Sequence, residues 1–290
     1  MLHVRSRAKI NLYLDVLRKR RDGYHHIETV FQTVSLADKL DFEPRASGLS
    51  MQCTNPGLEA GDDNLVMRAA RALQTATGCA LGAHIYLDKR IPLAAGLAGG
   101  SGNAAATLWA LNQLWETGLS DARLHRIAAT LGADVPYCLV GGTVAATGRG
   151  EIMSALPALP KTWLVLLHPD LAVSTKAVYT SPHLEKSSEK PFAGRTPAFR
   201  KATRAIGEGD FAAGIFNRME TAVFRMHPQL AELKANLLGA GCSAAAMSGS
   251  GPTVFGVCDS EAQAKQVASS LSNIRSTVVF TTPAALDSRA

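Results

Sequence analysis

The stretch PLAAGLAGGSGNAAA, residues 92–106, consists mostly of residues whose side chains are too small to do chemistry. Six of them are alanine and four are glycine. A turn of small residues that leads directly into a helix lets backbone N–H groups approach a ligand closely. These N–H groups and the positive end of the helix dipole form a site for an anion, commonly a phosphate. Composition alone leaves a close-packed turn against a neighbouring backbone as the alternative.

This loop lacks the lysine of a Walker loop, because no Gly-Lys-[Ser/Thr] follows its glycines. The dinucleotide pattern Gly-x-Gly-x-x-Gly does not occur in it in register either. The charge of a bound phosphate must therefore be offset by the helix end, by a metal ion or by a cation from elsewhere. Lys89 and Arg90 flank the loop, but we expect them to form a solvated strand end.

A second loop of glycine and serine, MSGSGPT at residues 247–253, directly precedes the apolar segment VFGV. Two such loops far apart in the sequence predict a cradle that is built from two domains. Each loop alone would be a weak signal, but together they indicate a nucleotide diphosphate or triphosphate as the ligand.

Two charged residues lie in segments with a clear local pattern. Asp134 lies in Gly-Ala-Asp-Val-Pro, where it could also cap a helix whose first turn holds Pro136. Lys9 lies in the middle of an alternating segment, on the face that it shares with Asn11. A lysine in solvent is the alternative for Lys9.

The elements that position these residues follow from periodicity. Strict alternation over residues 8–16 predicts a half-buried strand, and a turn leads to a second strand at 27–36. A helix should begin at Asn64 and end at Gly78. We expect further strands at 83–92, 161–169, 252–258 and 275–281, further helices near 102–115, 120–132, 197–206, 209–225, 228–239 and 260–271, and a polar mobile loop at 181–196.

Composition places the chain among globular proteins, with 47% hydrophobic and 19% charged residues. The longest strongly apolar run, WLVLL at 163–167, is far shorter than the roughly 20 residues that a membrane span needs. The first residues resemble neither a signal peptide nor a transit peptide. Five cysteines without a C-x-x-C pattern indicate reduced thiols. We therefore expect a cytoplasmic protein with no membrane partner.

The formal net charge of +6 allows nucleic-acid binding, but the pattern of the charges argues against it. Lysine and arginine are scattered, and RKRR at 18–21 is the only dense run. Basic and aromatic residues do not interleave along any strand, as they would in a non-catalytic nucleic-acid-binding protein. An anionic small substrate explains the mild basicity equally well.

Three blocks resemble the signature motifs of the GHMP kinases, the superfamily of galacto-, homoserine, mevalonate and phosphomevalonate kinases. Their order and approximate spacing agree with that family: AKINLYLDV at 8–16, PLAAGLAGGSGNAAATL at 92–108 and AMSGSGPTVFG at 246–256. Finer detail resembles the branch whose substrate is 4-diphosphocytidyl-2-C-methyl-D-erythritol. The blocks that carry this closer resemblance are RRDGYHHIETVFQTVSLAD at 20–38, DNLVMRAA at 63–70, LGADVPYCL at 131–139 and VSTKAVY at 173–179.

The resemblance implies an α+β fold of two domains. Residues 1–152 would form the ATP-binding α/β domain, and residues 153–290 a ferredoxin-like α/β domain on the substrate side. In this superfamily the two domains interleave at the chain termini. The last strand, near 275–281, is therefore expected to return to the first domain. We expect a monomer or a weak homodimer.

The resemblance also implies the reaction, which transfers the γ-phosphoryl group of ATP to the 2-hydroxyl of the substrate with Mg²⁺ as cofactor. Asp134 matches the family's catalytic aspartate and Lys9 the lysine beside it. The lysine would keep the aspartate ionised and offset charge on the moving group. The sequence leaves open whether the aspartate removes the hydroxyl proton or only orients the hydroxyl.

The family places ATP along the first loop, and Ser101 there could reach a phosphate or the Mg²⁺. Asn64 resembles a position on the adenosine side. The other residues expected to bind ATP are Leu93, Ala94, Ala95, Gly96, Leu97, Ala98, Gly99, Gly100, Gly102 and Asn103.

For the cytosine of the substrate, Tyr24 and Tyr179 match the family's stacking positions, and His25 matches the residue that reads the base edge. An exposed hairpin corner is the alternative for the segment that holds Tyr24 and His25. Homoserine and mevalonate have no base to stack, so this aromatic set argues against a kinase for either of them. The remaining residues expected to bind substrate are Asn11, Gly249, Ser250 and Gly251.

Two positions depart from the family pattern G-L-G-G-G-S-S-[ND]-A-A. Ala98 replaces a glycine, and Gly102 replaces the second serine. Because an alanine forced to positive φ costs roughly 1–2 kcal/mol, we expect Ala98 to have a negative φ. The glycine at 102 removes one hydroxyl that could contact phosphate or metal.

Overall fold

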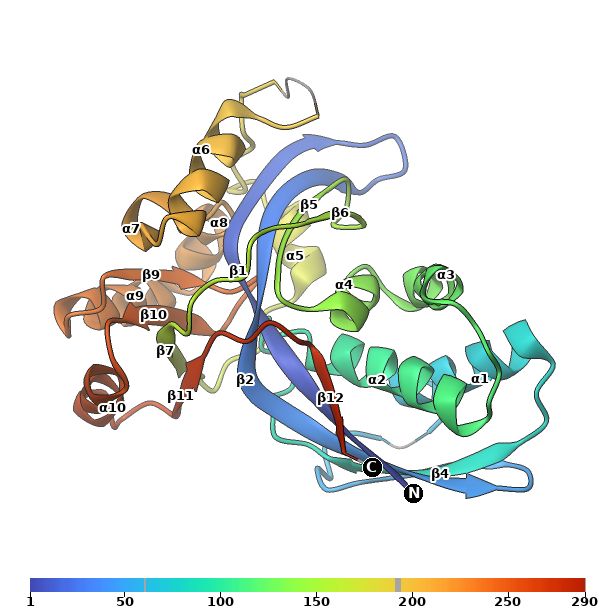
Figure 1. Ribbon diagram of the computed structural model, residues 1–290. Helices are drawn as coiled ribbons and strands as arrows, with labels where there is room; N and C mark the ends of the chain where they lie inside the picture. The colour runs from blue at the N-terminus through green and yellow to red at the C-terminus, as the bar shows by residue number, and fades with distance from the viewer. Residues whose placement is uncertain (60, 191–193, 290) are drawn as a thin grey trace.

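The structure, a computed structural model, describes residues 1–59, 61–190 and 194–289. Two β-sheets and the helices packed on them form a mixed fold of the predicted α+β class. Strands β1 (Leu2–Lys19) and β2 (His25–Arg45) form one long antiparallel hairpin. In Figure 1 this blue hairpin runs from the chain termini up between the two halves of the molecule.

The first sheet is built around this hairpin. Its other strands are β3 (Leu49–Cys53), β4 (Gly82–Asp88), β5 (Thr143–Thr147), β6 (Ile152–Ala155), β8 (Phe216–Asn217) and β12 (Leu286–Arg289). The strand order is β12-β1-β2-β4-β3, with β5 and β6 continuing from β2 and β8 beside β1. One apolar core joins this sheet to the helices α1 (Leu65–Thr77), α2 (Gly99–Leu114), α3 (Asp121–Leu131) and α4 (Val135–Val140).

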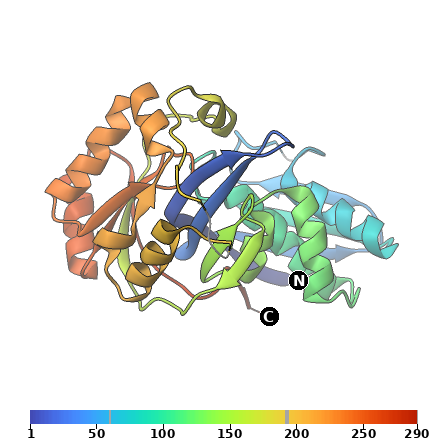
Figure 2. The same ribbon diagram turned by 90° about the horizontal axis from the view of Figure 1, so that it is seen from above.

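The second sheet is antiparallel, with the order β11-β7-β10-β9. Its strands are β7 (Trp163–Leu167), β9 (Ala244–Met247), β10 (Val254–Cys258) and β11 (Ser276–Phe280). Its helices are α5 (Thr175–Thr180), α6 (Pro197–Gly207), α7 (Phe211–Gly214), α8 (Glu220–Met226), α9 (Pro228–Gly239) and α10 (Glu261–Ser270). Figure 2 shows these orange and red elements on one side of the blue hairpin, and the cyan and green helices on the other. Within the described ranges, no helix has the length and apolarity to span a membrane.

Strand β1 is buried on both faces, so the expected half-buried strand is wrong. On one face, Ile10 and Leu12 share a core with Leu164 and Phe255 of the second sheet. On the opposite face, even the polar Lys9 is only 5% exposed. A period of two identifies the polar face of a strand, but it cannot show that protein also covers that face.

The strand expected near 275–281 forms β11, which pairs with β7 in the second sheet. Directly after β11, Thr281 forms a bridge to Val34 of β2 in the first sheet. The following strand, β12, crosses back and pairs with β1, where Leu286 lies opposite Ser6. The described part of β12 reads LDSR, too short and too polar to show a periodic pattern. The two ends of the chain consequently lie close together (Figure 1).

The ends of α1 agree with the sequence, whereas the start of α2 does not. Asn64 caps α1 by accepting a hydrogen bond from Val66 N at 2.9 Å, and Gly78 ends it with φ of 69°. Helix α2 begins at Gly99, three residues before the expected start near Gly102. No capping side chain marks this early start, because the residue before it is an alanine.

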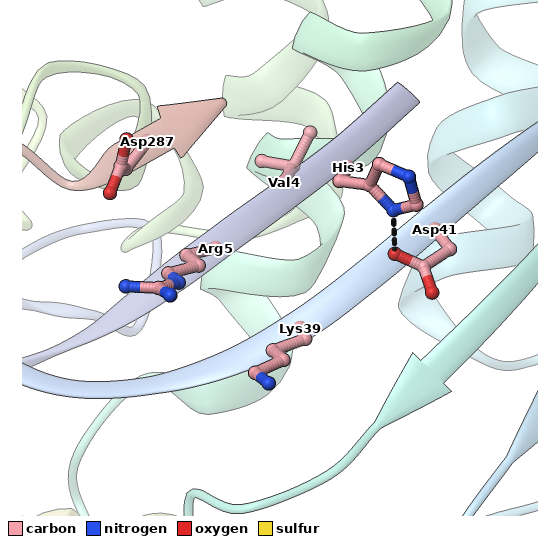
Figure 3. A pocket seen from close by; sticks show the side chains of 6 residues that line it. All are labelled: His3, Val4, Arg5, Lys39, Asp41 and Asp287. Carbon is pink, nitrogen blue, oxygen red and sulfur yellow. Dashed lines mark hydrogen bonds and ion pairs between the residues drawn. The ribbon is translucent and has the colours of Figure 1, made fainter. Parts of the chain in front are cut away.

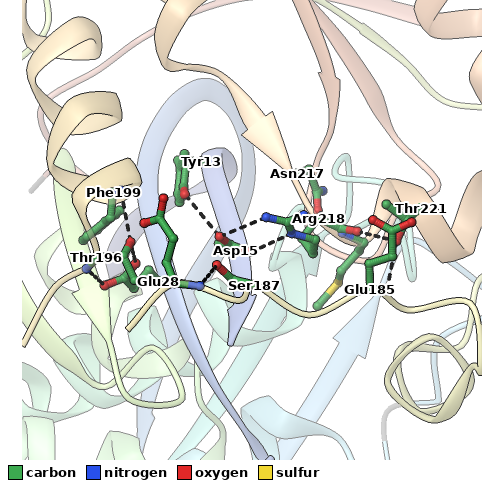
Figure 4. Close-up of polar contacts among 12 residues, drawn as sticks. Tyr13, Asp15, Glu28, Glu185, Ser187, Thr196, Phe199, Asn217, Arg218 and Thr221 are labelled. Atoms are coloured by element: carbon green, nitrogen blue, oxygen red, sulfur yellow. Dashed lines mark hydrogen bonds and ion pairs between the residues drawn. The ribbon is translucent and has the colours of Figure 1, made fainter. Parts of the chain in front are cut away.

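Buried carboxylates attach the second half of the chain to the hairpin (Figure 4). Arg218 Nε donates to Asp15 Oδ1 at 2.8 Å. Thr196 N donates to Glu28 Oε1 at 2.7 Å, and the Thr196 hydroxyl donates to the other oxygen. Burial raises the pKa of Glu28, and the nearby charge of Asp15 also raises it. The expected polar loop therefore ends against the hairpin, and residues 191–193 of it lie outside the described residues.

The buried His168 predicts a loss of stability in mild acid. Its ring nitrogens lie 3.2 Å from the hydroxyls of Thr253 and Thr277, and burial, together with Arg275, lowers its pKa to about 4. The folded protein binds a proton at His168 only near pH 4, whereas the unfolded chain binds it near pH 6.5. Acid therefore favours the unfolded chain, and the free energy of unfolding should fall by about 2 kcal/mol between pH 7 and pH 5. Urea unfolding at both pH values should show that His168→Gln lacks this loss. Equal losses in the wild type and the variant would contradict the assignment.

Candidate active site

The glycine loop, defined as residues 92–101, has positive φ at every second residue near its centre. The φ angles are 50° at Ala94, 74° at Gly96 and 56° at Ala98. The expectation of a negative φ at Ala98 is therefore wrong, and Ala94 adopts the same costly conformation, at about 1–2 kcal/mol each. Turns that alternate in this way direct successive N–H groups to one side and form a concave site for anions.

Helix α2 adds its own free N–H groups to this site. Its first helical hydrogen bond runs from Gly102 N to Ala98 O at 2.8 Å. The N–H groups of Gly99, Gly100 and Ser101 come before this bond and have no partner within the helix. Ala98 is the N-cap and has no side chain that could bind them. These three N–H donors and the positive end of the helix dipole thus point to the space in front of the first turn of α2, where they favour an anion.

Residues 248–251 of the second loop pack against the glycine loop. Ser248 Oγ donates to Gly96 O at 2.9 Å. A Cβ atom on Gly96 would lie 2.2 Å from the carbonyl oxygen of Ser248, so only glycine fits there. Asn217, which the sequence did not indicate, donates to the carbonyls of Met247 and Gly249 at 2.7 and 2.8 Å. Two loops from distant parts of the chain therefore lie in contact.

Lys9 and Asp134 come together beside these loops. Lys9 Nζ lies 3.5 Å from Asp134 Oδ2 and donates to Asn11 Oδ1 at 2.7 Å. The lysine side chain is 5% exposed, which excludes a solvated lysine, whereas the aspartate is 34% exposed. Asp134 is the N-cap residue of α4, but its carboxylate makes no capping hydrogen bond. Lys9 N also donates to Leu97 O at 3.1 Å, so the pair is attached to the glycine loop.

His25 is buried at the tip of the hairpin, and its ring stacks on Tyr179. The ring centroids lie 5.1 Å apart with an interplanar angle of 15°. Burial lowers the pKa of His25, and Lys186 and Lys19 lower it further. Burial also raises the pKa of Tyr179 to about 12. Both rings are therefore neutral at pH 7, and the imidazole offers one donor and one acceptor.

Tyr24 differs from its neighbours because 59% of its surface is exposed. The guanidinium of Arg149, which the sequence did not indicate, lies 5.1 Å from the Tyr24 ring centroid. The two tyrosines expected to stack on a base thus have different partners, with Tyr179 against His25 and Tyr24 against Arg149.

Other predicted residues have partners within the protein. Asn64 caps α1 and donates through Nδ2 to Glu59 O at 2.9 Å. The hydroxyls of Ser250 and Thr175 lie 2.7 Å apart. Gly251 has φ of 83°, which favours glycine at that position.

Gly102, which departs from the family pattern, lies next to Ser6, a residue that the sequence did not indicate. A Cβ atom on Gly102 would lie 2.6 Å from Ser6 Oγ. Ser6 Oγ and Asn103 Oδ1 are buried without a hydrogen-bond partner among the described residues. The Ser6 hydroxyl thus fills the space that a side chain at position 102 would need.

Lys89 is not the solvated strand end that the sequence predicts. Its side chain is 2% exposed and forms an ion pair of 2.6 Å with Asp38, which is fully buried. Arg90 does lie at the surface, with half of its side chain exposed, and it pairs with Asp88. The pattern of charges around the turn did not reveal which of the two cations points inward.

One hollow of the surface lies apart from these residues. It has a volume of about 270 Å³ and is lined by side chains of β1, β2 and β12 (Figure 3). His3 Nδ1 and Asp41 Oδ1 lie 2.6 Å apart there, and none of the predicted site residues lines it.

Comparison with known proteins identifies the family. The domain families "GHMP kinases N terminal domain" and "GHMP kinases C terminal" match residues 64–142 and 197–275. The 4-diphosphocytidyl-2-C-methyl-D-erythritol kinase of Syntrophus aciditrophicus is 42% identical over 97% of this chain and 98% of its own length. The chain belongs to this kinase family. The family member from Pelotomaculum thermopropionicum is 46% identical over 91% of both chains.

Solved structures agree with this family assignment. A crystal structure of 4-(cytidine 5'-diphospho)-2C-methyl-D-erythritol kinase superposes with a TM-score of 0.82 and 36% identity, covering 96% of this chain and 98% of its own. Homoserine kinase from Cytophaga hutchinsonii has a TM-score of 0.76 at 20% identity, which shows the shared fold. The predicted GHMP kinase fold is confirmed, and the chain is a kinase that uses ATP as phosphoryl donor.

The contact between Gly102 and Ser6 yields a test of how tightly the start of α2 is packed. Gly102→Ser should lower the free energy of unfolding by about 1–3 kcal/mol, because its Cβ atom would collide with Ser6 Oγ. Adding Ser6→Ala should recover most of this loss, since the interfering hydroxyl is then absent. Urea unfolding of both variants measures the effect. If Gly102→Ser cost the same with and without Ser6→Ala, the two positions would not be coupled.

Proposed function

We propose that Lys9 and Asp134 catalyse transfer of the γ-phosphoryl group of ATP to the 2-hydroxyl of 4-diphosphocytidyl-2-C-methyl-D-erythritol. The observation that carries this proposal is the 3.5 Å distance between Lys9 Nζ and Asp134 Oδ2, with Lys9 on a strand that is hydrogen-bonded to the glycine loop. Phosphoryl transfer depends mainly on positioning and on charge stabilisation. A buried cation beside a partly exposed carboxylate is suited to both.

In this mechanism, Asp134 accepts the hydrogen bond of the attacking hydroxyl. The hydroxyl oxygen forms a bond to the γ-phosphorus and gives up its proton by way of Asp134 to solvent. The bond from that phosphorus to the β–γ bridging oxygen breaks, so that ADP leaves. Lys9, whose ammonium lies 3.5 Å from this carboxylate, offsets negative charge on the phosphoryl group. Asn11 holds the Lys9 ammonium in place through its 2.7 Å hydrogen bond.

The phosphates of ATP would bind at the glycine loop and at the first turn of α2. The free N–H groups there and the helix dipole favour an anion. The second loop supports the glycine loop from the other side through the bond from Ser248 to Gly96. Asn64 lies next to Leu65, whose Cδ1 is 3.5 Å from a Cβ position at Gly100, which agrees with an adenosine side near α1.

Mg²⁺ is the cofactor that we infer to accompany ATP. The described residues contain no group of three His, Cys, Asp or Glu side chains that could hold a metal ion. In kinases, Mg²⁺ keeps several waters and is held largely by the phosphates of the substrate, so it needs few protein ligands. Ser101, in the first turn of α2, is the residue whose hydroxyl would reach it. The bound ion would offset the negative charge of the phosphates.

The cytidine of the substrate would bind at the hairpin tip. The exposed ring of Tyr24 offers a flat face, and the neutral His25 can pair with the edge of a base. Tyr179 supports the imidazole by stacking on it. This aromatic set distinguishes the substrate from homoserine and mevalonate, which contain no base.

Removing the catalytic pair should abolish turnover while leaving nucleotide binding intact. Lys9→Ala and Asp134→Asn should each lower kcat by about 100-fold or more and change the KM for ATP little. A coupled assay of ADP release with the cytidyl diphosphate substrate measures both constants. Wild-type rates in Lys9→Ala would exclude the proposed role of this lysine.

Truncation of Tyr24 should affect only the cytidyl substrate. Tyr24→Ala should raise the KM for that substrate about tenfold, because stacking on a base contributes about 1–3 kcal/mol. The KM for ATP should stay the same. Tyr86→Ala, at another exposed tyrosine on β4, is the matched control. Equal damage to both KM values would contradict this placement of the base.

A further inference from the structure

The glycine loop holds two alanines in a conformation that alanine avoids. Ala94 and Ala98 have φ of 50° and 56°. Such residues persist only where the surrounding structure fixes the backbone. At the middle of the loop, this support comes from Lys9 and Ser248, which bond to the carbonyls of Leu97 and Gly96. The two ends of the loop need support as well.

A buried ion pair fixes the end at which the chain enters the loop. Asp38 is fully buried and accepts hydrogen bonds from Arg90 N and Ile91 N at 2.7 and 2.8 Å. Its second oxygen accepts from Lys89 Nζ at 2.6 Å. The same ammonium donates to Ile91 O at 2.8 Å. Both backbone polar groups of Ile91 are therefore bound by this pair.

The same side chains support the end at which the chain leaves the loop. A Cβ atom on Gly99, the first residue of α2, would lie 2.9 Å from Lys89 Nζ and 3.0 Å from Ile91 Cγ2. Gly99 thus packs directly on the ammonium and on the residue that it holds. Residues at the start and the end of the strained loop meet at Lys89.

We propose that Lys89 and Asp38 are positioning residues of the nucleotide site, which hold both ends of the glycine loop in the conformation that binds phosphate. The inference rests on the proposed function, because it takes the loop as the ATP site. Lys89 does not act as a Walker lysine does. Its ammonium is buried and bonded to Asp38 and Ile91, so it acts on the phosphates through the backbone.

We call the ion pair of Lys89 and Asp38 the clamp. Removing the clamp should reduce the fraction of molecules in which the glycine loop has its binding conformation, and this lowers the apparent affinity for nucleotide. The variants are Lys89→Met and the double variant Asp38→Asn with Lys89→Met. The double variant leaves no unpaired buried charge, so it carries the test if the single variant does not fold. Arg90→Met is the matched control, because Arg90 lies in the same turn but at the surface.

Calorimetric titration with a non-hydrolysable ATP analogue gives the affinity directly, and the KM for the cytidyl substrate serves as the second readout. We expect the Kd of the analogue to rise about tenfold in both clamp variants, while the KM for the cytidyl substrate stays within about twofold. Arg90→Met should bind the analogue like the wild type.

Replacing the two strained alanines by glycine distinguishes a loss of loop conformation from a general loss of protein stability. Ala94→Gly with Ala98→Gly should recover most of the lost affinity in the clamp variants, because glycine adopts positive φ readily. The same changes should not raise the affinity of the wild type, since its loop is already formed. Wild-type affinity in the clamp variants, or no recovery by glycine, would overturn the inference. A wild type that does not bind the analogue would overturn the proposed nucleotide site, and this inference with it.

Discussion

Lys9 connects the parts of the site on which the chemistry depends. Its backbone N–H bonds to Leu97 of the glycine loop, and its ammonium lies between Asn11 and Asp134. The strand that carries it is buried on both faces and packs against both halves of the molecule. A single strand, whose position both halves determine, therefore contacts both the glycine loop and the Asp134 carboxylate, the groups that we propose for nucleotide binding and catalysis.

Contacts from outside the glycine loop maintain its backbone conformation, which the conformational preferences of its alanines oppose. Ala94 and Ala98 are strained, and Gly96 leaves no room for a side chain against Ser248. The second loop comes from the other half of the chain and bonds to Gly96, so the proposed nucleotide site requires both halves to be assembled. Preorganisation of this kind means that backbone donors need not be ordered when phosphate binds.

Local features of the sequence were predictable, and features that depend on distant contacts were not. The cap at Asn64 and the stop at Gly78 follow from residue types alone. The positive φ of Ala98 could not be predicted, because the loop is held by contacts from distant residues such as Lys9 and Ser248. The burial of Lys89 depends on Asp38, fifty-one residues away in the chain. The pairing of β12 with β1 joins the two ends of the sequence and leaves no periodic signal in four residues.

A crystal structure of the ternary complex with a non-hydrolysable ATP analogue and 4-diphosphocytidyl-2-C-methyl-D-erythritol tests the central claim most directly. We predict that the phosphates lie on the N–H groups of Gly99, Gly100 and Ser101. We also predict that the 2-hydroxyl lies about 2.6–3.2 Å from the Asp134 carboxylate, with the Lys9 ammonium beside it. A 2-hydroxyl bound away from Asp134, or phosphates bound away from the start of α2, would contradict the claim.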